Sequence, residues 1–105
     1  MNTFTNKFDA LESLIHTEGI RIETLDFHPD LDLFLVILNT KAILRQKLSH
    51  HARLKNASLV ELKNFELTGD GTGIHWPKLD EDLSLKGFLK EELKNIVINP
   101  NEKAA

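Results

Sequence analysis

An unbroken apolar run near the middle of the chain, Leu33–Leu38, constrains the fold more than any other feature of the sequence. It lies within the longer stretch Leu31–Leu38, which is rich in residues that favour β-strands. Because side chains alternate between the two faces of a strand, this segment is apolar on both faces. The run is far too short to span a membrane as a helix. It therefore predicts a central strand.

Alternating segments on either side of this run supply neighbouring strands. After Asn39-Thr40-Lys41, one face of the next segment carries Ala42, Leu44, Gln46 and Leu48, and the other carries Ile43, Arg45 and Lys47. The two segments are therefore predicted to form a hairpin, and the charged residues place its second strand nearer an edge of the sheet. Before the apolar run, apolar and polar residues alternate over Ile20–Phe27, and the alternation changes phase near Thr24. This pattern predicts a strand with an irregularity at that point.

Two shorter strands, Phe65–Leu67 and Ile74–Trp76, flank a connection that contains Gly69, Gly71 and Gly73. Glycines of this kind can cradle a phosphate when a helix follows them. Here a strand-like segment follows and no Lys-Ser/Thr pair is present, so the sequence predicts a hairpin turn rather than a nucleotide site. Trp76 is predicted to lie in the core.

Three helices are predicted. Apolar residues at helical spacing indicate one over Lys7–Thr17, and the capping box formed by Ser58 and Glu61 indicates a short one over Leu59–Asn64, with Leu59 and Leu62 facing inward. The third starts after the cap Ser84 and ends at Asn99-Pro100, with an apolar stripe of Leu85, Phe88, Leu89, Leu93, Ile96 and Val97.

A chain of 105 residues has room for one domain. We expect an α+β fold, with an antiparallel sheet of four to five short strands and the N-terminal, central and C-terminal helices packed on it. Within it, residues 1–19 form an added N-terminal helix, 20–98 the core and 99–105 a frayed tail.

The charge and the cysteine content of the chain exclude several classes of function. Lys and Arg total 13 against 16 Asp and Glu, for a net charge of −3, which counts against nucleic acid as the sole partner. The chain has no cysteine, which excludes disulfides, thiol nucleophiles and Cys-ligated metals and fits a cytoplasmic protein. No signal peptide or membrane segment is predicted.

The histidines do not form a metal-binding pattern. His50 and His51 are adjacent, and no pair with helical i, i+4 spacing completes a site, so we expect no metal and no cofactor. Ser49 beside them lacks the nucleophile-elbow motif, so we expect no catalytic residue and no enzymatic activity.

Two charged clusters are candidate contact surfaces. Asp80, Glu81 and Asp82 precede the cap of the last helix, where carboxylates stabilise the positive helix end or attract a basic partner. A second cluster is basic and is either a solvated face or a surface for DNA phosphates: Lys41, Arg45, Lys47, Arg53 and Lys55.

The segment Gly71–Leu89, with the string Gly-Thr-Gly-Ile-His-Trp-Pro followed by Lys-Leu-Asp-Glu-Asp, resembles the closing motif of the bacterial domain-of-unknown-function family numbered 2442. The resemblance extends in order from Leu31, through the hairpin, Arg53-Leu54-Lys55 and the short helix. It implies a compact α+β fold and an antitoxin-like partner of another small protein encoded next to it.

From this resemblance we expect a non-enzymatic protein that binds and neutralises a small basic partner, the toxin of the pair. The candidate contacts are Asp80, Glu81, Asp82, His75, Phe8 and Leu11. Two alternatives stay open, a DNA-binding autoregulatory module that uses the basic cluster and a small enzyme that uses His75 with the nearby carboxylates. Self-association also stays open.

Overall fold

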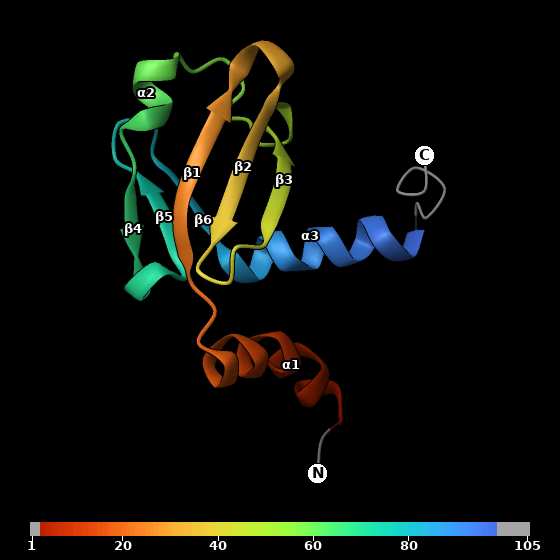
Figure 1. Cartoon of the computed structure of the whole chain (residues 1–105). Coiled ribbons are helices and arrows are strands. Elements are labelled where there is room, and N and C mark those ends of the chain that lie inside the picture. Colours follow the sequence, from red (N-terminus) through yellow and green to blue (C-terminus); the bar gives the residue numbers. More distant parts are fainter. Residues whose placement is uncertain (1–2, 99–105) are drawn as a thin grey trace.

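The central apolar run lies in the middle of a three-stranded antiparallel sheet, as predicted (Figure 1). The computed structural model describes residues 3–98, with side chains from residue 10 onward. In the first sheet, β2 (Leu33–Leu38) pairs with β1 (Ile22–His28) and β3 (Ile43–Lys47). The register between β1 and β2 shifts between Ile22 and Thr24, which confirms the predicted irregularity.

The prediction of a single sheet is wrong, because the remaining strands form a second antiparallel sheet, in the order β4 (Glu66–Thr68), β5 (Gly73–Trp76) and β6 (Glu81–Ser84). β4 and β5 form the predicted hairpin. Residues 3–98 therefore form six strands in two sheets, and the α+β class is confirmed.

The helices are α1 (Thr3–Glu18), α2 (Leu59–Lys63) and α3 (Leu85–Ile98), with short 3₁₀ turns at Pro29–Leu31, Leu48–His50 and Gly69–Gly71. The capping box of α2 is present, since the Ser58 hydroxyl accepts from the Glu61 N–H and the Glu61 carboxylate accepts from the Ser58 N–H. Leu62 is fully buried, but Leu59 is exposed, so the inward orientation predicted for Leu59 is wrong.

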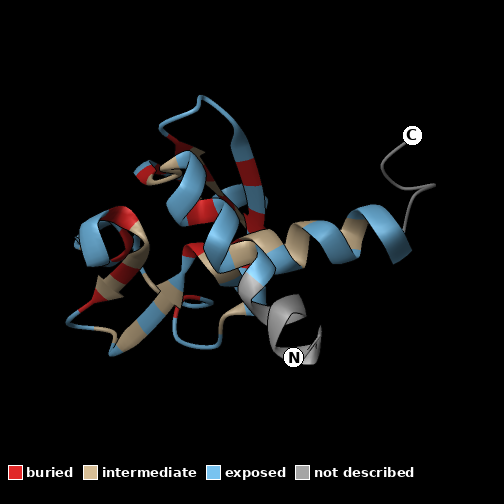
Figure 2. Ribbon diagram, turned by 90° about the horizontal axis from the view of Figure 1, so that it is seen from below, coloured by how far each residue is buried: buried red, intermediate tan, exposed pale blue. Residues whose placement is uncertain are grey.

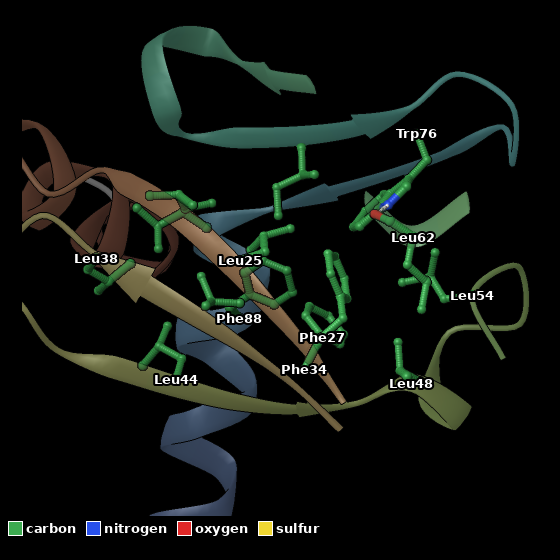
Figure 3. Close-up of a cluster of buried hydrophobic side chains, with 14 of the residues drawn as sticks. Leu25, Phe27, Phe34, Leu38, Leu44, Leu48, Leu54, Leu62, Trp76 and Phe88 are labelled. Carbon is green, nitrogen blue, oxygen red and sulfur yellow. Dashed lines mark hydrogen bonds between the residues drawn. The ribbon is translucent and has the colours of Figure 1, made fainter. Parts of the chain in front are cut away.

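The core joins the two sheets through aromatic rings (Figure 3). Phe27 of the first sheet stacks on Phe34 at 5.7 Å between ring centroids and contacts Trp76 of the second sheet edge-on at 6.5 Å. The Trp76 indole N–H donates to the Leu62 carbonyl at 2.9 Å, which also ties α2 to this junction. The core position predicted for Trp76 is confirmed.

The last helix packs on the body only through its first half. Leu85 and Phe88 are buried, whereas Leu93, Ile96 and Val97 are exposed. Figure 2 shows the far half of α3 extending away from the sheets with mostly exposed residues. The apolar stripe was therefore predicted correctly as a helix, but half of it does not reach the core. The predicted frayed tail lies outside the described residues.

Candidate partner-binding edge and pocket

The three acidic residues lie on an edge strand and its preceding turn rather than in the first turn of a helix. Glu81 and Asp82 belong to β6, which pairs with β5, and α3 begins only at Leu85. Asp80 occupies the turn before β6 with a left-handed φ of 53°. The three residues precede the cap Ser84, as predicted, but Glu81–Ser84 form a strand that the sequence analysis did not predict, because this segment pairs with β5.

Ser84 nevertheless caps α3 as predicted, since its hydroxyl accepts from the Gly87 N–H at 3.0 Å. One residue thus ends the strand and starts the helix.

Each acidic side chain is held by a neighbour. The Asp80 carboxylate bonds to the Arg53 guanidinium at 3.0 Å, and the Glu81 carboxylate accepts from the Asp82 N–H at 3.0 Å. Asp82 Oδ1 lies 2.8 Å from His75 Nδ1, across the strand pair. We call Asp80, Glu81 and Asp82 the acidic edge.

The His75–Asp82 contact follows from strand geometry. His75 and Asp82 are directly opposite in the antiparallel register of β5 and β6. Directly opposite residues of this kind bring their side chains close together. His75 thereby joins the acidic edge, but it lines neither of the two pockets described below.

The basic cluster is not a separate patch free of acidic groups. Arg53 pairs with Asp80, and Lys41 of the β2–β3 turn lies 3.7 Å from Glu23 of β1. Arg45 and Lys47 share the exposed face of β3, and Lys55 is exposed in the loop before α2. Two of the five basic candidates are thus partly neutralised, one of them by a candidate of the acidic set.

The candidates of the N-terminal helix lie apart from the acidic edge. α1 contacts α3, and Leu11 is half-buried there while Ile15 is buried. Phe8 lies in α1, but its side chain is outside the described set. Lys86 of α3 lies 3.7 Å from Glu12 of α1, and this pair borders a shallow pocket of about 270 Å³ that also includes His16 and Thr72.

A second pocket, of about 230 Å³, opens between β3, β6 and α3. It brings Asp82 of the acidic edge together with residues that the sequence analysis did not select, namely Gln46, His51, Ser84 and Glu91. The sequence contained one indication of this pocket, because Gln46 is a polar residue at a position of its strand that faces the core.

His51 forms the inner wall of this pocket with Gln46. Its Nε2 lies 3.2 Å from Gln46 Oε1, and its ring contacts Phe34 edge-on at 5.9 Å. Burial lowers the pKa of His51 below its usual value and the nearby His50 acts in the same direction, while Glu81 and Glu91 oppose the shift. The ring is therefore held neutral near pH 7.

The serine beside the histidines has a structural role. Both the N–H and the hydroxyl of Ser49 donate to the Asp32 carboxylate, at 2.8 and 2.6 Å, which fastens the β1–β2 turn to the end of β3. The Ser49 hydroxyl bond lowers the pKa of Asp32. Among the described residues, no group of three or more His, Cys, Asp or Glu side chains could hold a metal ion, and no helix there is long and apolar enough to cross a membrane.

Two solved structures resemble this fold. A protein of unknown function from Rhodospirillum rubrum is 28% identical and matches 69% of this chain and 87% of its own, with a TM-score of 0.60. An uncharacterised protein from Chromobacterium violaceum is 19% identical and matches 95% of this chain and 94% of its own, with a TM-score of 0.63. The second likeness concerns the fold alone, and its coverage reaches beyond the core into the terminal helices.

No curated protein matches the sequence. The family model described as "Protein of unknown function (DUF2442)" matches residues 22–94, which include both sheets, α2 and most of α3. By this match, which covers well over half of its residues, the chain belongs to the DUF2442 family.

Proposed function

We propose that this protein is a non-enzymatic, antitoxin-like binding protein that neutralises a small basic partner encoded nearby. The observation that carries the proposal is the acidic edge, three successive carboxylates held on ordered backbone at the border of a sheet. Such charges steer a basic partner at little further cost in side-chain entropy, because their positions are already restricted.

The carboxylates stay accessible although they are held. The side chains of Asp80 and Asp82 are 84% and 76% exposed. Their contacts with Arg53 and His75 are therefore surface contacts of small energy, which a partner's cations can replace. His75 is a candidate partner contact for the same reason, since it shares the Asp82 carboxylate.

Apolar surface for a protein partner lies on the two long helices. Leu14 of α1 and Leu93, Ile96 and Val97 of α3 are exposed large hydrophobic residues. Apolar surface beside a charged rim is typical of protein interaction sites. Neutralising a partner made by the same cell implies that the complex forms in the cytoplasm.

Co-expression with the product of the neighbouring gene, followed by co-purification and binding kinetics, tests the proposal. We expect Asp82→Lys to lower the association rate about tenfold and to flatten its salt dependence, because edge charges act mainly on association. Glu23→Lys is the control, since Glu23 lies exposed on β1 of the other sheet. The proposal fails if the neighbour's product does not bind, or if reversal of all three acidic residues leaves both rates unchanged at low salt.

A further inference from the structure

The charged side chains that line the pocket beside the acidic edge are all acidic. Asp82 approaches it from β6 and Glu91 from α3, and among the residues whose side chains the structure describes no Lys or Arg lines it. The other pocket differs, because it contains the Glu12–Lys86 pair and so presents both signs of charge. A ligand of the first pocket should therefore be cationic.

The inner wall is rigid and offers acceptors. Gln46 is 95% buried, its Nε2 donates to the Arg45 carbonyl, and its Oε1 therefore accepts from His51 Nε2. With Nε2 carrying the proton, the neutral His51 ring keeps Nδ1 as an acceptor. The wall thus adds no positive charge near pH 7 and does not need to rearrange when a donor group enters.

The remaining walls are apolar or small. Phe88 and Leu83 line the pocket, and Gly87 presents no side chain beside them. Asp82 uses Oδ1 for His75, which leaves its second carboxylate oxygen outside that contact. The ligand therefore meets carboxylates on two sides and apolar side chains between them.

We propose that this pocket binds the guanidinium group of an arginine side chain, which the partner protein presents to it. The binding of arginine stands on the pocket alone, whereas its origin in a partner rests on the proposed function. A planar guanidinium is weakly hydrated and has five donors in a fixed fork, which suits carboxylates on two walls of a partly apolar pocket. A lysine ammonium is more strongly hydrated and acts as a point charge, so it gains less here.

Titration of the ¹⁵N-labelled full-length chain with N-acetyl-arginine amide tests the pocket without any partner protein. We expect NMR shifts at the Gln46 side-chain amide and at Ser84 and Gly87, which saturate in the millimolar range expected for a single side chain, about 1–10 mM. N-acetyl-lysine amide should bind at least about threefold more weakly.

Two variants locate the contact. Glu91→Gln and Asp82→Asn should each weaken binding of the arginine amide at least about threefold, while Glu23→Gln, in the other sheet and outside the pocket lining, should leave it unchanged. Dispersed amide spectra of all three variants show whether each one folds, and because Glu91 lies on the surface of α3, its variant keeps the test available if Asp82→Asn unfolds.

The proposal is overturned if the pocket amides do not shift at about 50 mM arginine amide, if the lysine amide binds equally well, or if Glu91→Gln has no effect. If the chain binds the arginine amide but does not bind the neighbouring gene's product, the proposed function is rejected and the arginine site is retained. A complex with the neighbour's product that tolerates both pocket variants would keep the proposed function and reject the arginine contact.

Discussion

Trp76 joins three parts of the fold. Its ring is fully buried between Phe27 and Phe65, and its indole N–H satisfies the Leu62 carbonyl. The residue therefore holds β5, α2 and the first sheet together, and both its apolar area and its hydrogen bond are lost when it is truncated.

We expect Trp76→Ala to lower the free energy of unfolding by about 3–5 kcal/mol, measured by urea titration. Trp76→Phe keeps most of the ring but leaves the Leu62 carbonyl unpaired, which should cost about 1–3 kcal/mol for the missing bond. A loss below about 1 kcal/mol for the alanine variant would contradict the central position of this ring.

His51 should give the protein a pH-dependent stability. Burial lowers its pKa in the folded state below the usual 6.5, so between pH 6.5 and that lower value the unfolded chain binds more protons than the folded one. The free energy of unfolding should therefore fall as the pH drops through this window, and His51→Gln should make the fall smaller. The comparison is denaturant unfolding at pH 7 and pH 5, with His16→Gln, an exposed histidine of α1, as the control. An unchanged slope in the His51 variant would refute this origin.

At the scale of elements, the 3₁₀ turn between β4 and β5 is fitted against the start of β1. Gly71 in this turn is buried with a left-handed φ of 92°, and a Cβ there would lie 3.1 Å from the Arg21 Cβ and 3.3 Å from the Ile22 carbonyl oxygen. The glycine-rich connection is thus a packing contact between the two sheets.

Comparing Gly71→Ala with Gly19→Ala separates packing from backbone strain. Gly19 also has a left-handed φ, of 64°, but a Cβ there would have no neighbour within 4 Å. The conformational cost for alanine, roughly 1–2 kcal/mol, applies to both, so Gly71→Ala should lower the free energy of unfolding by about 1 kcal/mol more than Gly19→Ala. Equal losses of unfolding free energy in the two variants, measured by thermal or urea unfolding, would show that the turn does not pack tightly against the start of β1.

At the scale of the whole molecule, the two sheets share one aromatic core and leave a helix projecting from it. The candidate pocket lies where the two sheets and this helix meet, and its residues come from β3, the segment after it, β6 and α3. The acidic edge and the basic cluster also contact each other, since Arg53 binds Asp80. No single stretch of sequence contains this arrangement.

The sequence by itself determined the features that depend on neighbours along the chain. The apolar run Leu33–Leu38 specifies a central strand, and Ser58, Glu61 and Ser84 specify helix starts, because a cap bonds to backbone within three residues of itself. The strand irregularity at Thr24 was predictable for the same reason, since a change of phase is local.

Only the tertiary structure decided the second sheet, the strand character of Glu81–Ser84, the exposure of Leu59 and of the outer half of α3, and the pocket around Gln46 and His51. A short acidic segment becomes a strand because β5 offers it partners, and a helical apolar stripe is buried only as far as the body reaches. Both outcomes depend on pairings between distant residues, whose energies local spacing does not contain.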